Sequence, residues 1–103
     1  MKLLTKEIEK KLPPLYSQEN KGENAIVQAK FFCPWNHWTW YATEYDPTDK
    51  LFFGYVDGDF GELGYFALEE LESIHGPFGL KIERDLHFRP ISLKEVMSKC
   101  QKY

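Results

Sequence analysis

The sequence contains no long apolar run and only two cysteines. No stretch approaches the roughly 20 apolar residues that a membrane-crossing helix needs, which argues against a membrane protein. Residues 1–7 include only two apolar residues after the initiating Met1 before charges resume, so we predict no signal peptide and a cytoplasmic location. Cys33 and Cys100 lack metal-type spacing, and in a reducing compartment we expect both to be unpaired thiols.

Basic side chains are scarce in the middle of the chain. Residues 31–80 hold nine acidic side chains and one basic one, Lys50, so this segment carries −8, whereas the two flanks together carry +5. Like charges that cluster on a fold either solvate a surface or meet a basic partner. The candidate partner-binding residues are six carboxylates of this segment: Asp57, Asp59, Glu62, Glu69, Glu70 and Glu72.

Aromatic residues are abundant, at 17% of the chain, and they favour strands over helices. A chain of 103 residues has room for one core, so we predict a single domain over residues 1–103. The expected strands are residues 25–32, 37–45, 51–56, 63–66 and 82–88. Short connections join the first four, which therefore pair antiparallel in chain order.

Three short helices are expected around this sheet. Thr5 can cap a helix that ends near Leu12, before two prolines, and residues 68–75 carry helical apolar spacing. Ser92 and Glu95 form a capping box that opens a helix to about Lys99. The predicted fold is α+β: an antiparallel, aromatic-rich meander of four to five strands, with short helices near the N-terminus, after the fourth strand and at the C-terminus.

The alternation of Trp38, Trp40 and Ala42 with polar or tyrosine neighbours has the period of two that strands require. Side chains two residues apart on a strand point to the same face. We therefore expect Trp38 and Trp40 to share a face, and at least one of them to be buried against a helix.

Two short patterns suggest chemistry, but each has a simpler explanation. The carboxylates of residues 57–62 are ligands that hard cations prefer, but Glu62 stands where a calcium loop needs glycine, and a hairpin turn explains the segment. Cys33 and His37 flank a three-residue turn and could pair as a nucleophile and a base. No third residue that would orient them is evident, and we predict no metal, cofactor or catalytic residue.

Charged and apolar residues alternate along residues 83–89. On a strand, Asp85, His87 and Arg89 would share one face and could bind an anion or perform acid–base chemistry, with Glu62 or Tyr65 as neighbours. A strand with one solvated face produces the same pattern. This segment is the candidate ligand-binding site of a small enzyme or ligand-binding domain.

Several blocks of the sequence resemble one known family. They are residues 38–44 (Trp-Thr-Trp-Tyr-Ala-Thr-Glu) and 83–88 (Glu-Arg-Asp-Leu-His-Phe), together with residues 3–8, 12–16, 52–58 and 62–66. The chain is similar over nearly its whole length to the bacterial domain-of-unknown-function family DUF2958. The resemblance implies a stand-alone domain encoded on plasmids and other mobile elements, beside DNA-transfer and antirestriction genes. It implies no activity and no catalytic residues.

Three functions remain open from the sequence. The leading hypothesis is a non-enzymatic module that binds a protein partner through its acidic, aromatic middle, for example an inhibitor whose carboxylates imitate phosphates in a nuclease. The second is an enzyme or ligand-binding domain that uses residues 85–89. The third is stacking of single-stranded nucleic acid on Trp38, Trp40 or Tyr41, which the acidic middle disfavours because it repels phosphate.

Overall fold

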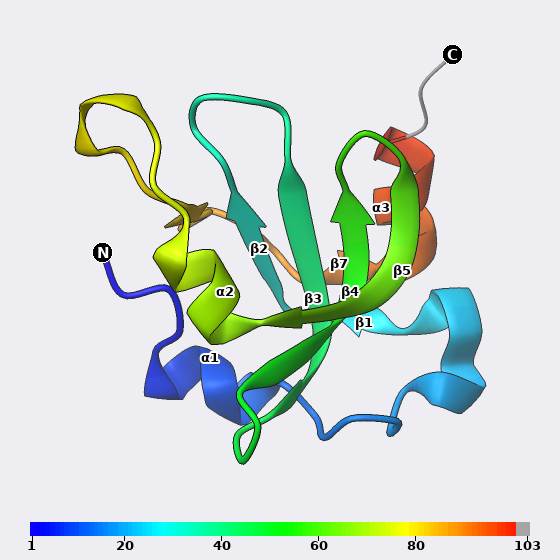
Figure 1. Cartoon of the computed structure of the whole chain (residues 1–103). Helices are drawn as coiled ribbons and strands as arrows, with labels where there is room; N and C mark the ends of the chain where they lie inside the picture. Colours follow the sequence, from blue (N-terminus) through cyan, green and yellow to red (C-terminus); the bar gives the residue numbers. More distant parts are fainter. Residues whose placement is uncertain (101–103) are drawn as a thin grey trace.

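The computed structural model describes residues 1–100, which form an antiparallel sheet with helices packed on both faces (Figure 1). The sheet has the strand order β5-β4-β3-β2-β6, and β1 and β7 form a separate antiparallel pair. The predicted α+β meander is therefore confirmed. The strands are β1 Ile26–Val27, β2 Ala29–Phe32, β3 Thr39–Asp46, β4 Leu51–Asp57, β5 Gly61–Ala67, β6 Glu83–Arg84 and β7 Ile91–Ser92. The helices are α1 Lys6–Lys11, α2 Leu68–Ser73 and α3 Leu93–Cys100, with 3-10 segments η1 Glu19–Asn24 and η2 Pro77–Gly79.

Side-chain caps fix where two of these helices begin. The Thr5 hydroxyl accepts a hydrogen bond from the Ile8 amide at 3.2 Å, as expected for an N-cap. The Ser92 hydroxyl likewise accepts from the Glu95 amide at 3.2 Å, which is one half of the predicted capping box. Both helices therefore start where the sequence predicted.

The first predicted strand, residues 25–32, is divided at Gln28. The Gln28 amide still donates to the Ala42 carbonyl of β3 at 2.9 Å, but the chain before it leaves this sheet. Ile26 and Val27 pair instead with β7, which precedes α3. This change of partner brings α3 onto the sheet.

The fifth predicted strand, residues 82–88, is much shorter than expected. β6 covers two residues and lies beside β2, at the edge opposite β5. Asp85 ends it, because its side-chain Oδ1 accepts from the His87 amide at 2.9 Å and its carbonyl accepts from the Phe88 amide at 3.3 Å. Aspartate favours such turns, which compete with strand pairing.

The sheet buries apolar side chains on both faces. On one face, Phe31, Trp40 and Phe52 pack in one cluster with Leu71 of α2 and with residues of the N-terminal segment. On the other face, Tyr55 packs with Val96 of α3. We refer to these as the α2 face and the α3 face; Figure 1 shows α1 and α2 well separated from α3.

Trp38 and Trp40 both lie on the α2 face, with ring centroids 6.0 Å apart. Trp40 is 8% exposed and belongs to the same buried cluster as Leu71 of α2, whereas Trp38 is half-buried. The expectation of a shared face with one tryptophan buried against a helix is confirmed.

A β-bulge at Thr43 reverses the alternation of β3. The register of β3 against β4 shifts between Ala42 and Glu44, and the Thr43 hydroxyl donates to the Phe53 carbonyl at 3.1 Å. An extra residue exchanges the faces of all the residues that follow it. Tyr45 consequently packs on Phe52 of the α2 face, and Glu44 lies opposite Phe53 on the α3 face.

The two cysteines are unpaired, as expected. Cys33 is buried, and burial also raises the pKa of the Cys100 thiol, which lies 3.6 Å from the Tyr41 hydroxyl. We predict that a thiol reagent counts two thiols in denatured, non-reduced protein and that both react much more slowly in the native state. Burial shields the Cys33 sulfur from the reagent, and the raised pKa of Cys100 leaves less of its reactive thiolate. A count of zero in freshly prepared protein would contradict this.

Candidate partner-binding cleft

A hollow of about 650 Å³ opens on the α2 face between the β2–β3 turn and α2. We call it the tryptophan cleft. Its volume falls within the range of ligand-binding sites in proteins, roughly 300–1,000 Å³. Its lining includes Trp35, Trp38, Trp40, Glu62, Glu70 and His75.

Local packing fixes the three indole rings. Trp40 lies in the β3 part of the cleft, and Trp38 packs so closely on Gly58 that a Cβ there would stand 2.4 Å from the ring. Trp35 packs in the same way on Gly76, where a Cβ would stand 2.5 Å from its ring. Any larger residue at 58 or 76 would displace a tryptophan.

Carboxylates supply the charge of the cleft. Glu62 comes from β5 and Glu70 from α2, and neither carboxylate forms a hydrogen bond or ion pair within residues 1–100. In this part of the chain no lysine or arginine lines the cleft, and its other polar groups belong to Cys33, Asn36, Tyr65 and His75. The cleft is therefore aromatic and negatively charged, which suits a cation.

The six predicted carboxylates do not form one cluster. Only Glu62 and Glu70 line the tryptophan cleft. Asp57 follows Tyr55 on β4 by two residues and so shares the α3 face, where burial, with a smaller contribution from the charge of Asp57, raises the pKa of Tyr41. Asp59 lies at the β4–β5 turn, 3.9 Å from His37 Nε2, and Glu69 lies 3.7 Å from Lys50 Nζ.

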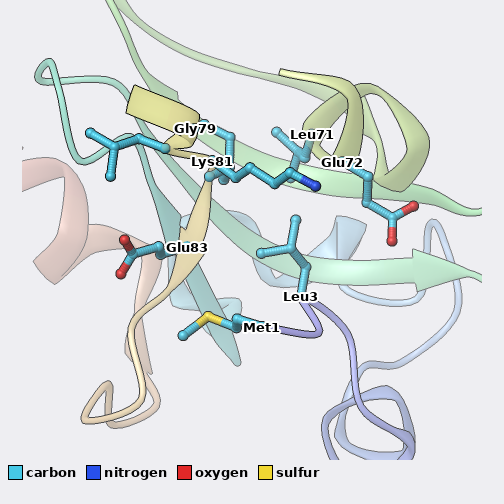
Figure 2. Close-up of a pocket in the computed structure, with 9 residues that line it drawn as sticks. Met1, Leu3, Leu71, Glu72, Gly79, Lys81 and Glu83 are labelled. Atoms are coloured by element: carbon cyan, nitrogen blue, oxygen red, sulfur yellow. The ribbon is translucent and has the colours of Figure 1, made fainter. Parts of the chain in front are cut away.

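Glu72 lines a separate hollow of about 410 Å³ near the N-terminus (Figure 2). Figure 2 shows the Lys81 side chain extending across this hollow toward Glu72, while Glu83 lies on the other side. Charges of both signs therefore line it, and its apolar lining residues are Met1, Leu3, Leu71, Leu80 and Ile82. Such a lining selects neither a cation nor an anion.

The expected strand face of Asp85, His87 and Arg89 is absent. All three residues follow the end of β6, and the backbone turns at Asp85. The Asp85 carboxylate lies 3.7 Å from Lys30 Nζ, so a neighbouring base already partners it. The prediction that these residues share one strand face is wrong, because a local aspartate turn replaced the strand.

Cys33 and His37 do not face one another either. Cys33 is buried, whereas the exposed His37 ring places Nε2 3.1 Å from the Gly58 carbonyl oxygen of the β4–β5 turn. Within residues 1–100, no three His, Cys, Asp or Glu side chains lie where they could hold a metal ion. The cleft therefore stands as the candidate site.

Sequence reasoning missed Trp35 and His75. Trp35 looked like a turn residue and His75 like the end of a helix, yet both line the cleft. The turn and the segment after α2 meet only in the fold, where Trp35 packs on Gly76. A local sequence pattern cannot indicate a contact between segments that lie about 40 residues apart.

Comparisons with known proteins identify a family without an assigned activity. A family model described as "Protein of unknown function (DUF2958)" matches residues 3–100, nearly the whole chain. No curated protein and no solved structure matches. Within residues 1–100, no helix combines the length and the apolar character that crossing a membrane requires.

Proposed function

We propose that this chain, which belongs to the DUF2958 family of proteins of unknown function, is a binding module that holds basic side chains of a protein partner in its tryptophan cleft. One observation carries the proposal. All three tryptophans of the sequence line the same cleft, together with two carboxylates that no base within residues 1–100 neutralises.

The chemistry of the cleft favours lysine and arginine. Indole is the strongest cation–π partner among aromatic side chains, and a guanidinium also stacks on its face. Glu62 and Glu70 add a charge of −2 at the same place. Single-stranded nucleic acid could stack on these rings, but the carboxylates would repel its phosphates. A basic protein segment can both stack on the indole rings and neutralise the charge of the carboxylates.

Exposed aromatic side chains beside the cleft support a protein partner. Figure 1 shows that the β2–β3 turn, the β4–β5 turn and the η2 segment emerge at the same end of the molecule. Phe60 on the β4–β5 turn is 83% exposed, and Phe78 in η2 is fully exposed with a left-handed φ of 57°. Such a backbone costs about 1–3 kcal/mol and persists mainly at functional sites. Aromatic residues are also enriched in interfaces.

Among proteins with basic side chains, we propose a nucleic-acid-processing enzyme as the partner. Such enzymes present lysine and arginine to phosphates, and carboxylates can occupy the same positions. The association with mobile elements that the family resemblance implies would place the protein beside such enzymes in the cytoplasm. The module would then act as an acidic inhibitor.

Tryptophan fluorescence tests the core of this proposal, because every tryptophan lines the cleft. We expect hexa-arginine to change the emission saturably and hexa-glutamate to leave it unchanged. Binding should weaken as salt rises, since ions screen exposed charges over about 8 Å at physiological ionic strength. The double variant Glu62→Gln/Glu70→Gln should bind hexa-arginine at least tenfold more weakly, because it removes both carboxylates of the cleft.

The matched control is Glu7→Gln/Glu95→Gln, which removes the same charge from exposed positions on α1 and α3. This control should bind as the native protein does. Equal losses in both double variants would show that net charge alone attracts the peptide, and the cleft proposal would be rejected. The same pair of variants, used as baits in affinity purification with mass spectrometry, should differ in the partner that they retain.

A further inference from the structure

We propose that a second site, on the opposite face of the sheet, binds a small organic ammonium compound with an apolar body. A pocket of about 370 Å³ lies there between β3, β4, β5 and the segment that leads into η1. We call it the tyrosine pocket, and its lining includes Tyr16, Gln18, Glu44, Phe53, Leu63 and Tyr65. None of the tryptophans lines it, and among the described residues it shares only Tyr65 with the lining of the tryptophan cleft.

A buried carboxylate forms the polar end of the pocket. Glu44 is 4% exposed, and its Oε1 and Oε2 accept hydrogen bonds from the Tyr16 amide at 2.9 Å and the Gln18 amide at 2.7 Å. Within residues 1–100 no basic side chain pairs with it. Carboxylate oxygens accept more than one hydrogen bond each, so Glu44 retains acceptor capacity.

Gln18 provides an acceptor that the protein leaves unused. Its side-chain Oε1 is buried and has no hydrogen-bond partner within the described part of the chain. Buried polar atoms are nearly always paired, and an exception calls for an explanation. Gln18 lines the pocket beside Glu44, and rotation of its side-chain amide would turn this oxygen toward an N–H donor of a bound ligand.

Aromatic and aliphatic side chains form the rest of the pocket. The Phe53 and Tyr65 rings meet edge to face with centroids 5.0 Å apart, and Leu63 lies beside them on β5. Tyr16 and Tyr65 both line the pocket, and hydrogen bonding to Tyr16 raises the pKa of Tyr65. Tyr16 has a left-handed φ of 71°, a strained conformation that is common in ligand clamps.

The charge of the lining selects the class of ligand. Glu19 and Glu23 of η1 also line the pocket, and no lysine or arginine among the described residues does. An ammonium group carries three donors, which suits Gln18 Oε1 and the Glu44 carboxylate, and its charge is attracted to the aromatic faces. A carboxylic acid of the same size would be repelled.

Three small probes of similar shape test this inference: 2-phenylethylammonium, 2-phenylethanol and 3-phenylpropionate. In amide NMR titrations of the ¹⁵N-labelled protein, we expect the ammonium to shift the signals of Tyr16, Gln18 and Phe53 saturably. Its affinity should exceed that of the alcohol at least tenfold, and the carboxylate should not bind. The indole N–H signals of the three tryptophans should stay in place.

Two variants separate binding from folding. Gln18→Met keeps the length of the side chain and the backbone amide that donates to Glu44, but removes the unpaired oxygen. It should weaken binding of 2-phenylethylammonium at least tenfold while the melting temperature stays unchanged or rises. Leu63→Arg places a cation at a half-exposed position of the pocket and should abolish binding. Leu86→Arg, at an exposed position outside the pocket, is its control.

Several results would overturn the inference. They are an absence of saturable shifts with 2-phenylethylammonium, equal binding of the three probes, shifts confined to the tryptophan cleft, and native affinity in both pocket variants. A failure of hexa-arginine to bind the tryptophan cleft would leave the tyrosine pocket unaffected.

Discussion

Replacing Trp40 by alanine should lower the free energy of unfolding by about 3–5 kcal/mol, the range observed when large aromatic side chains are removed from protein cores. Trp40 is almost completely buried on β3, in the cluster that holds Phe31 and Phe52 against α2. Its removal leaves a cavity between the sheet and the helix, because a close-packed interior relaxes only partly. Urea denaturation monitored by circular dichroism measures the loss, since fluorescence would change with the tryptophan itself.

Trp38→Ala is the matched control, because it removes the same side chain from the same face of the same strand. Trp38 is half-buried and borders the tryptophan cleft, so its loss should reduce stability less than the loss of Trp40. Both variants should weaken binding of hexa-arginine. Unchanged denaturation midpoints in both would contradict the assignment of Trp40 to the core.

Most of the fold could be predicted because aromatic residues and turns follow local rules. Alternation along residues 38–42 places Trp38 and Trp40 on one face, and short turns force antiparallel neighbours. The sequence also indicates the starts of α1 and α3 through their capping residues Thr5 and Ser92. These features depend on residues a few positions apart.

The bulge at Thr43 could not be predicted from alternation. A strict period of two would place Glu44 with Trp40 and Ala42 on the α2 face, inside an apolar cluster. The bulge moves Glu44 to the α3 face, where two backbone amides reach its carboxylate, and it brings Tyr45 onto Phe52. Burying an unpaired carboxylate costs free energy, and the bulge avoids this cost by moving Glu44 away from the apolar cluster. The environment of residue 44 depends on the assembled sheet, so alternation along the strand does not reveal it.

The acidic segment shows that carboxylates close together in sequence need not lie together in the fold. Asp57 and Glu62 lie five residues apart at the two ends of the β4–β5 turn, yet they occupy opposite faces because of the strand period. Glu62 instead joins Glu70 of α2, on the same face. Net charge over a segment therefore predicts an acidic protein, whereas the pairing register decides which carboxylates act together.

The other large effect that we expect comes from Glu44→Ala, which should lower the free energy of unfolding by about 3–5 kcal/mol. The Tyr16 and Gln18 amides both donate to this carboxylate, and a hydrogen bond to a charged group contributes about 1.5–3 kcal/mol. Alanine would leave both donors without their acceptor and would release residues 15–18 from the sheet. Denaturation should show the loss, and hydrogen exchange should show faster exchange of the two amides.

Glu44→Gln distinguishes the hydrogen bonds from the volume of the side chain. Glutamine fills the same space but offers only one oxygen, so one of the two amides must face an NH₂ group. Its cost should lie between zero and that of alanine, with faster exchange confined to one of the Tyr16 and Gln18 amides. If both amides stay protected from exchange in Glu44→Ala, other acceptors hold residues 15–18 in place. The role of Glu44 in the native protein would then be confined to the tyrosine pocket. If both lose protection, the same carboxylate shapes the pocket and anchors its strained Tyr16, so affinity for 2-phenylethylammonium should fall together with stability.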